Sequence, residues 1–401
     1  MKFLGIFLVL VLFFSCKTGK TDGKADNRIN IIKQENMPET RKILSVDEKG
    51  LNEYETLEIQ PEVFFDTGAK IRSAILADNG RLYFGNENCE FFAVDIAAKQ
   101  MLWMYSTDDA VQTWPVIADD KIIFNARNSL YILDSVSGNE IHKVSCSSGK
   151  TFRVSWEDYA FSDSYTAVSD GIAYYAALDG GLAAVDINEG NIIWAVPPGT
   201  YSGAVASGVN FYNGKLYYTD FLGSLCCFDL QTRKIVFQTL ITDRIFAQMY
   251  INDGKIYAAG RSSKMYCIDA NNGEVIWSSF SNDPTTWFSG GSVFIGSTIY
   301  TGTSDEKTII AFNKDTGEFI RIYPTKENVY TPPLLNGENI IVAATDVYSQ
   351  RRSYIMEFDT KNHTKRWQAQ LDDCILSPAA IYQGTLYFGS DSGKVYAIDL
   401  K

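Results

Sequence analysis

The chain has 401 residues, enough for two or three domains of average size or for one large all-β unit. Its 46% apolar content is that of a globular protein, and abundant Tyr and Phe with only 10 Pro favour β-strands. A formal net charge of −12 speaks against the basic surface of a nucleic-acid-binding protein, so no nucleic-acid partner is expected.

The N-terminus has the features of an export signal followed by an anchor point. An apolar run extends from Phe3 to Phe14 after a single Lys. A run of this length is too short to span a hydrocarbon core of about 30 Å, but it fits a secretory signal. Cys16 follows Ser15 directly and resembles the acylated cysteine of a bacterial lipobox. The sequence therefore predicts a lipoprotein signal peptide at 1–15 and lipid attachment at Cys16; an ordinary secretory signal is the alternative.

Residues 16–45 are polar, rich in Lys, Asp and Asn, and lack a sustained hydrophobic period. Such a segment is predicted to be a flexible tether. The folded part of the chain is then expected at residues 46–401.

An internal repeat fills this folded part. Aligned on one Asp or Asn, it recurs at intervals of 39 to 52 residues. The aligned residues are Asp95, Asp134, Asp186, Asp229, Asp269, Asn313, Asp359 and Asp399. Short alternating runs separated by turns precede each of them, as in TLYFGS and KVYAID within residues 385–399. Four antiparallel strands per roughly 43 residues, repeated eight times, predict an all-β fold, the eight-bladed β-propeller of four-stranded blades.

Residues at two later positions in the repeat, four and eight residues after the aligned Asp or Asn, are predicted to join neighbouring blades. In four repeats, a Gly four residues later (Gly138, Gly190, Gly273 and Gly317) permits a positive φ in the turn, and the aligned carboxylate is expected to accept hydrogen bonds from backbone N–H groups of that turn. An aromatic side chain eight residues later is expected to enter the gap between blades. The clearest predicted docking pairs are Asp95 and Trp103, Asp186 and Trp194, Asp269 and Trp277, and Asp359 and Trp367. His142 and Arg321 occupy the aromatic position in the second and sixth repeats, where a looser contact is expected.

The eighth repeat ends before its fourth strand can form. An open ring would leave a bare sheet edge. Residues 54–65 (YETLEIQPEVFF) precede the first inner strand and are apolar enough to supply the strand. We expect residues near 55–65 to complete the last blade, so that an N-terminal strand closes the ring.

The pattern A/I-x-D-x-x-x-G-x-x-x-W resembles the tryptophan-docking repeat of the pyrroloquinoline-quinone (PQQ)-like β-propeller family over residues 55–401. Similarity to its lipidated, stand-alone members implies a periplasmic-side scaffold, held at the outer membrane of a bacterial cell envelope by its lipid alone. It also implies a monomeric propeller that binds a subunit of the outer-membrane β-barrel assembly machinery. No P-loop, G-x-S-x-G or G-x-G-x-x-G occurs and only two His are present, so we predict no catalytic, cofactor-binding or metal-ligating residue.

Two other functions stay open. The family also contains quinoprotein dehydrogenases that bind PQQ with calcium beside a vicinal cysteine pair, and Cys226-Cys227 invites that comparison. In a strand, however, successive side chains point to opposite faces, so this pair is expected to be structural. A ligand-binding or sensor propeller without catalysis is the second alternative.

Side chains just before the inner strands are expected to face the axial funnel, where propellers bind ligands and partners. Packing on one another to plug the axis is the alternative. The candidate partner surface comprises Arg72, Trp114, Tyr201, Arg244, Trp287 and Tyr330, with Trp156 from an aromatic-rich insertion at 149–165. A second insertion, at 345–354, carries Arg351 and Arg352 on a hairpin tip and is interpreted as solvated decoration.

Overall fold

The structure is a computed structural model that describes residues 31–33, 56–126, 129–145, 166–176, 181–196, 208–220, 223–241, 245, 247–281 and 286–400. The predicted signal peptide, Cys16, most of the tether and the insertion at 149–165 lie outside the described residues. Within the described residues, no helix is long and apolar enough to cross a membrane.

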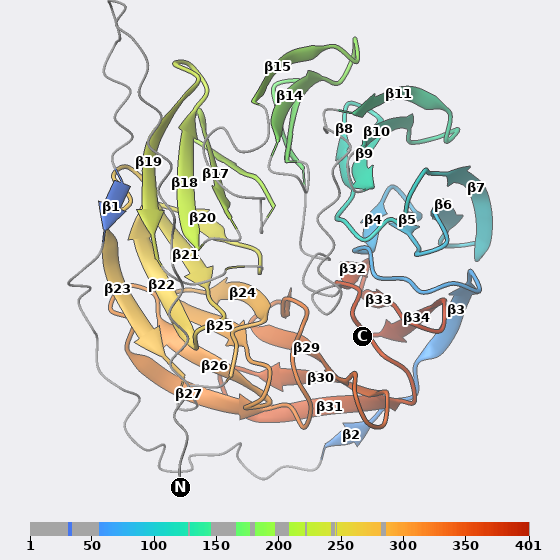
Figure 1. Ribbon diagram of the computed structural model, residues 1–401. Helices are drawn as coiled ribbons and strands as arrows, with labels where there is room; N and C mark the ends of the chain where they lie inside the picture. Colours follow the sequence, from blue (N-terminus) through green and yellow to red (C-terminus); the bar gives the residue numbers. More distant parts are fainter. Residues whose placement is uncertain are drawn as a thin grey trace, which may run out of the picture.

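The described strands form eight sheets arranged as blades around a ring (Figure 1). Strands are given from the inside of the ring outward. Blade 1 comprises β4 (Leu76–Asp78), β5 (Arg81–Gly85), β6 (Glu90–Asp95) and β7 (Gln100–Ser106); blade 2 comprises β8 (Val116–Ala118), β9 (Lys121–Ala126), β10 (Ser129–Asp134) and β11 (Glu140–Ser145). Blade 3 comprises β12 (Ala167–Ser169), β13 (Ile172–Ala176), β14 (Leu182–Asp186) and β15 (Ile192–Val196); blade 4 comprises β16 (Asn210–Tyr212), β17 (Lys215–Thr219), β18 (Ser224–Asp229) and β19 (Lys234–Leu240).

The second half of the ring continues the same order. Blade 5 comprises β20 (Tyr250–Asn252), β21 (Lys255–Ala259), β22 (Lys264–Asp269) and β23 (Val275–Phe280); blade 6 comprises β24 (Gly290–Ile295), β25 (Thr298–Gly302), β26 (Thr308–Asn313) and β27 (Phe319–Pro324). Blade 7 comprises β28 (Leu334–Asn336), β29 (Asn339–Asp346), β30 (Arg352–Asp359) and β31 (Thr364–Leu371); blade 8 comprises β32 (Ala380–Tyr382), β33 (Thr385–Gly389), β34 (Lys394–Asp399) and β3 (Glu62–Asp66). The predicted eight-bladed propeller of four-stranded antiparallel blades is confirmed.

The N-terminal strand closes the ring as predicted, with one difference. Strand β3 pairs antiparallel with β34, in a register that places Glu62 opposite Ala397. Residues 57–58, expected in the same blade, instead form β2 (Leu57–Glu58), which runs parallel to β31 in blade 7. Pro61 lies between the two strands, and a proline has no N–H to donate to a sheet ladder, so pairing is interrupted there.

A further short strand adds to blade 4. Strand β1 (Ile31–Lys33) pairs parallel with the outer strand β19, and Ile31 lies opposite Gln238. These residues fall inside the segment predicted as a flexible tether. Two outer edges of the ring therefore carry a segment of the same chain.

The described apolar core divides into eight clusters, one at each seam between neighbouring blades. At several seams, a ring from one blade packs on the turn of the next. A Cβ atom added to Gly138 would lie 2.4 Å from Trp103, and one added to Gly317 would lie 2.6 Å from Trp277. The Trp277 indole also donates a hydrogen bond to the Lys314 carbonyl oxygen at 3.1 Å. Only a residue without a side chain leaves room for these rings.

The turns that receive the rings share one backbone conformation. A positive φ occurs four residues after the aligned position in seven blades, at Lys99, Gly138, Gly190, Arg233, Gly273, Gly317 and His363. The aligned carboxylate closes the turn: Asp134 accepts the backbone N–H groups of Ser137 at 2.7 Å and Val136 at 3.1 Å. Hydrogen bonds from Ser137 lower the pKa of Asp134, and the one from the Ser137 backbone N–H has a larger effect than the one from its hydroxyl. Asp95, Asp186, Asp269 and Asp359 accept backbone N–H groups in the same way.

Blades 2 and 6 keep a ring at the seam, although neither has Phe, Tyr or Trp eight residues after its aligned Asp or Asn. The His142 ring packs on Gly190, and its Nε2 lies 2.7 Å from the Asn188 carbonyl oxygen. In blade 6, Tyr323 lies two residues beyond Arg321, and its hydroxyl lies 3.0 Å from Nδ1 of His363. Burial, followed by the nearby Arg321 charge, lowers the pKa of His363. Other rings thus replace the Trp at both seams.

The seam between blades 5 and 6 offers a direct test of ring-on-turn packing. Gly317→Ala places a methyl group against Trp277 at a positive φ, so we expect the free energy of unfolding to fall by about 2–4 kcal/mol. Gly337 also has a positive φ but nothing within 4 Å of an added Cβ, so Gly337→Ala should lose only about 1 kcal/mol. Urea unfolding of both variants measures the difference. Equal losses would show that the ring contact contributes nothing beyond backbone strain.

Candidate functional site

The topology gathers one set of loops on a single face of the ring. In a four-stranded antiparallel blade, the turn between the second and third strands lies at the same end as the connection to the next blade. We call this end the connection face. Of the predicted partner surface, Arg72, Trp114, Trp287 and Tyr330 lie there, each just before an inner strand. Trp156, Tyr201 and Arg244 lie outside the described residues.

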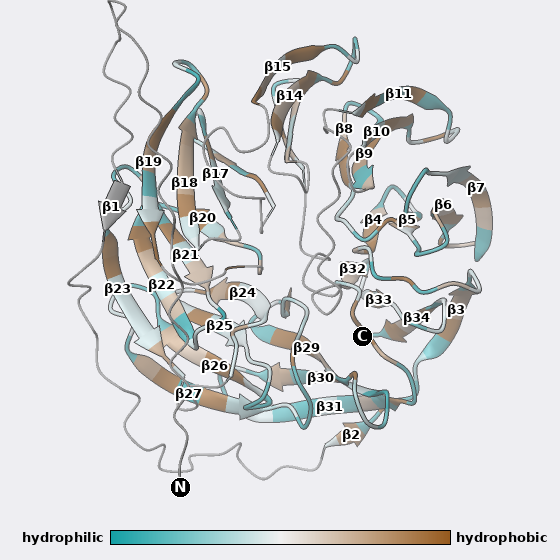
Figure 2. Cartoon of the chain, in the orientation of Figure 1, coloured by the Kyte–Doolittle hydropathy of each residue, from teal (hydrophilic) through white to brown (hydrophobic). Residues whose placement is uncertain are grey.

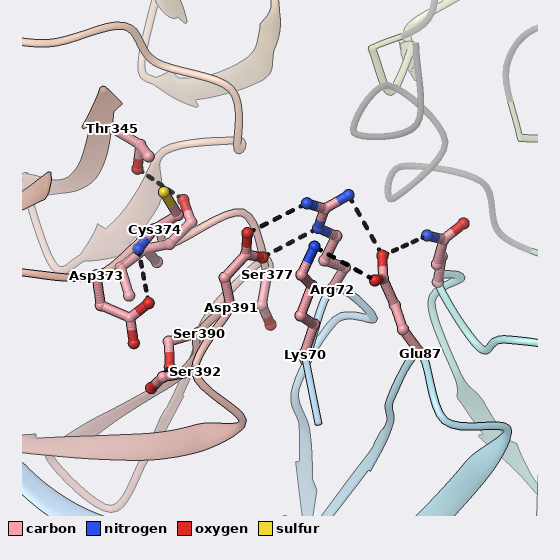
Figure 3. Close-up of polar contacts among 12 residues, drawn as sticks. Lys70, Arg72, Glu87, Thr345, Asp373, Cys374, Ser377, Ser390, Asp391 and Ser392 are labelled. Carbon is pink, nitrogen blue, oxygen red and sulfur yellow. Dashed lines mark hydrogen bonds and ion pairs between the residues drawn. The ribbon is translucent and has the colours of Figure 1, made fainter. Parts of the chain in front are cut away.

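A buried ion pair joins the first and last blades on the connection face (Figure 3). The Arg72 guanidinium donates through Nε and Nη2 to the two carboxylate oxygens of Asp391, at 3.0 and 3.2 Å. The two side chains are 10% and 2% exposed. Asp391 belongs to the turn between β33 and β34, whereas Arg72 precedes β4. This two-point contact therefore fixes how the two ends of the propeller meet.

Other charged groups extend this pair to neighbouring blades. Arg72 Nη1 lies 3.3 Å from a Glu87 carboxylate oxygen, and Lys70 Nζ lies 3.9 Å from the other oxygen. Gln112, before blade 2, donates to Glu87 at 2.8 Å. From blade 7, Arg351 donates to Asp391 at 2.9 Å. We call Lys70, Arg72, Glu87, Gln112, Arg351 and Asp391 the seam cluster.

The seam cluster corrects the interpretation of the hairpin tip at 345–354. This tip was expected to be solvated decoration, but Arg351 reaches across to blade 8 and pairs with a buried carboxylate. The Asp346 carboxylate holds the tip in shape by accepting the backbone N–H groups of Tyr348, Ser349 and Gln350. The hairpin is therefore part of the connection face.

The electrostatics of the seam cluster follow from its burial. Burial alone raises the pKa of Asp391, but the hydrogen bonds and charge of Arg72, together with Arg351, outweigh it and lower that pKa. The hydrogen bond to Asp391 likewise raises the pKa of Arg351. The Glu87 and Asp391 carboxylates are thus both paired within the cluster, while the side chains of Lys70 and Arg351 are 45% and 54% exposed. The cluster presents a cationic rim to solvent.

The other candidate side chains of this face are also engaged. The Arg261 guanidinium stacks 3.6 Å from the centre of the Trp287 ring. Tyr330 is buried, and its hydroxyl accepts a hydrogen bond from Asn328 at 2.9 Å. Glu327 lies 2.7 Å from Lys307 and 3.4 Å from Arg352. The described part of the face is therefore a layer of mutually bonded side chains that exposes charges of both signs, among them Lys307, Arg351, Asp108 and Asp305.

The vicinal cysteines do not fit a quinone site. Cys226 and Cys227 are both fully buried in β18. Cys226 packs in the core cluster between blades 3 and 4, and Cys227 packs in the one between blades 4 and 5. Burial raises the pKa of the Cys227 thiol to about 11. Among the described residues, no group of three or more His, Cys, Asp and Glu side chains could hold a metal ion.

Sequence reasoning found Arg72 but missed its partners. Glu87 and Asp391 lie in turns between second and third strands (NEN and DSG) that look like ordinary polar turns. The blade topology could have indicated these partners, because turns between second and third strands lie at the end of the blade where Arg72 was expected. Pairing an acid from each turn with each cation before an inner strand would have suggested the cluster.

Breaking the buried pair should destabilise the ring. Arg72→Met leaves the Asp391 carboxylate with Arg351 as its cationic partner, and we expect a loss of about 2–4 kcal/mol at pH 7. The folded-state pKa of Asp391 is lowered, so this contribution is present above its unfolded value of about 4 and disappears as the pH falls through the folded value. Urea unfolding across this range measures both effects. Lys70→Met, at an exposed ion pair, should cost under about 1 kcal/mol, and a loss equal to that of Arg72→Met would contradict the assignment.

Comparison with known proteins identifies the family. The family model described as outer membrane protein assembly factor BamB matches residues 56–197, 178–290 and 261–401. BamB of Moranella endobia (strain PCIT) is 22% identical over 296 residues, which is 69% of this chain and 71% of the relative. A quinoprotein ethanol dehydrogenase of Pseudomonas putida is 35% identical over 80 residues, but these are 18% of this chain and 13% of the enzyme. The crystal structure of BamB from Moraxella catarrhalis shares the fold, with a TM-score of 0.62 and 17% identity over 84% of this chain and 98% of that chain. The chain belongs to the BamB family of PQQ-repeat β-propellers.

Proposed function

We propose that this protein is a non-enzymatic scaffold, anchored by a lipid at Cys16 to the periplasmic side of a bacterial outer membrane. There it binds a subunit of the machinery that assembles outer-membrane β-barrel proteins. The observation that carries the proposal is the family match, which extends through the propeller from residue 56 to residue 401. The relatives it resembles are named as outer membrane protein assembly factors.

The connection face is the part of the ring best suited to bind a folded partner. The whole chain has a net charge of −12, yet this face carries the exposed ends of Lys70, Lys307 and Arg351. Their acidic partners are already inside the layer, so the cationic rim can attract carboxylates of another protein. Arg72 and the buried acids beneath it hold this rim in place. We infer that the partner presents an acidic loop to this face.

A quinoprotein-type oxidoreductase has weaker support. The similarity to the dehydrogenase spans only 13% of that enzyme. The cysteine pair that suggested the resemblance is divided between two seams of the ring. A fold shared with an enzyme does not carry its activity, because activity resides in the site.

Crosslinking in native membranes tests the proposal. We expect mild crosslinking and affinity purification of the full chain to recover an outer-membrane barrel-assembly subunit, and Cys16→Ser to reduce that recovery. Removing two charges from the rim, with Lys70→Gln and Arg351→Gln, should reduce it several-fold, because attraction between complementary charged surfaces speeds association.

Lys361→Gln is the matched control, since it removes an exposed Lys from the turn after β30, at the opposite end of the blades. Equal recovery from the rim variant and the control would place the partner elsewhere on the ring. Recovery of no envelope protein, together with saturable binding of PQQ and Ca²⁺ by the purified chain, would overturn the scaffold in favour of the quinoprotein.

A further inference from the structure

The hairpin between the second and third strands of blade 7 is longer than its counterpart in blade 8. Both ladders begin at the aligned Asp of their blade. In blade 8 the last pair joins Gly389 to Val395, whereas in blade 7 three more pairs follow the equivalent position, and the last joins Asp346 to Arg352. At about 3.3 Å per residue, these pairs lengthen the hairpin by roughly 10 Å on the connection face. We call the loop at 347–351, between β29 and β30, the blade 7 tip.

The base of this hairpin is fixed on both sides. The Thr345 backbone N–H donates to the Asn328 carbonyl oxygen at 2.7 Å, in the connection that enters blade 7. On the other side, the buried Ser353 hydroxyl donates to the Asp373 carbonyl oxygen at 2.7 Å and accepts the Ile375 backbone N–H at 3.0 Å. The hairpin is therefore held between the connections that enter and leave its blade.

The tip itself is ordered by its own residues. The Asp346 carboxylate accepts three successive backbone N–H groups at 2.8 to 3.0 Å, those of Tyr348, Ser349 and Gln350. Arg351 then has a positive φ of 48°, which turns the chain back into β30. Because these contacts fix the loop before a partner arrives, binding would cost little of its conformational entropy.

This ordered tip exposes an aromatic side chain. Tyr348 is 75% exposed, more than any other large apolar or aromatic side chain in the part of the chain that the structure describes. The apolar residues of the hairpin lie further down, in the buried middle of β29, while the outer strand β31 of this blade is largely hydrophilic (Figure 2). The Tyr348 ring thus adds nothing to the core and is presented to whatever meets the connection face.

The exposed charge beside Tyr348 is cationic. Arg351 is half-exposed, whereas its partner Asp391 is buried. Arg352 is likewise more exposed than its partner Glu327. A guanidinium carries five N–H donors, so each Arg can bind a second carboxylate without releasing the first. A partner that receives the Tyr348 ring would therefore gain from carboxylates next to its pocket.

We propose that the blade 7 tip anchors a folded partner protein: the Tyr348 ring enters an apolar pocket of the partner, and Arg351 and Arg352 pair with carboxylates at the edge of that pocket. Tyr and Arg are among the residue types that most often dominate the binding energy of an interface. An anionic membrane surface fits less well, because the chain has a net charge of −12. The inference rests on the proposed function, since it assigns to that function the side chain that holds the partner.

Site-specific photocrosslinking of the full chain in native membranes tests the anchor. We expect p-benzoylphenylalanine in place of Tyr348 to crosslink to one folded envelope protein, at a site that mass spectrometry places beside an Asp or Glu. The matched control is the same photoreactive residue in place of Val136, an exposed apolar residue in a turn at the opposite end of the blades. Its yield should be at least about fivefold lower, because contacts outside the anchor region are few and weak.

Substitutions measure how much the ring and the order of the tip contribute. Tyr348→Ala should lower recovery of the crosslinked protein in affinity purification about tenfold or more, with an unchanged melting temperature because the side chain is exposed. Tyr348→Phe keeps the ring and should stay within about twofold of the wild type. Asp346→Ala frees the three N–H groups of the tip and should lower recovery several-fold with Tyr348 still present. Val136→Ala should leave recovery unchanged.

The outcomes separate the anchor from the proposed function. If the wild type recovers an assembly subunit and Tyr348→Ala recovers as much, the anchor is overturned and the proposed function stands. If position 348 crosslinks to a folded protein outside the assembly machinery and Tyr348→Ala abolishes its recovery, the anchor is established and the proposed partner is wrong. Absence of a crosslink from position 348 overturns the anchor. Crosslinks to lipid would overturn it in favour of a membrane contact, and crosslinks to a second copy of this chain in favour of self-association.

Discussion

The contact between a ring on one blade and a positive-φ turn on the next holds the propeller together. No blade has a core of its own, since every described apolar cluster lies between two neighbours. A buried aromatic side chain removes about 150–250 Å² from water, on the order of several kcal/mol at each seam. The turn must leave space for the ring, which explains Gly at 138, 190, 273 and 317. The sequence repeat thus encodes the packing of each blade on the next.

The closing seam obeys the same rule with different residues. Phe64 of the N-terminal strand packs in the cluster between blades 8 and 1, and the Lys99 ammonium lies 5.8 Å from the centre of its ring. Lys99 has the positive φ that Gly has in other turns. On the connection face, the Arg72–Asp391 pair joins the same two blades. A buried ion pair adds little net stability over apolar packing, but its geometry favours one alignment of the two ends.

The sequence predicted the architecture because a repeat of eight units shows each rule several times. Strand order, the Asp turn, the aromatic position and closure by an N-terminal strand all follow from local pattern. Replacement of the Trp by His142 or Tyr323 did not follow from it. His142 stands at the aromatic position and Tyr323 two residues beyond it, and only the folded blades show that each ring lies at its seam. The seam cluster was not predicted, since Arg72 and Asp391 are 319 residues apart and only the blade topology brings the connection before β4 to the turn between β33 and β34. The sequence placed Arg72 just before an inner strand, where the structure has it, without showing that it would pair with Asp391.

The functional surfaces follow from this construction. A ring with rigid seams presents two kinds of surface, a face of connecting loops and a set of outer strand edges. The first carries a cationic rim over buried acids, and the second carries added strands on blades 4 and 7. We propose that the first of these, the connection face, binds a partner protein.

Hydrogen exchange of the closing seam tests the account most directly. Phe64→Ala removes the buried ring that docks blade 8 on blade 1, while Val63→Ala alters an exposed neighbour on the same strand. If each blade depends on its neighbour, Phe64→Ala should speed amide exchange in β4–β7 and β32–β34 together, and Val63→Ala should leave both slow. Faster exchange confined to residues 62–66 would show that the blades are independently stable and would contradict the account.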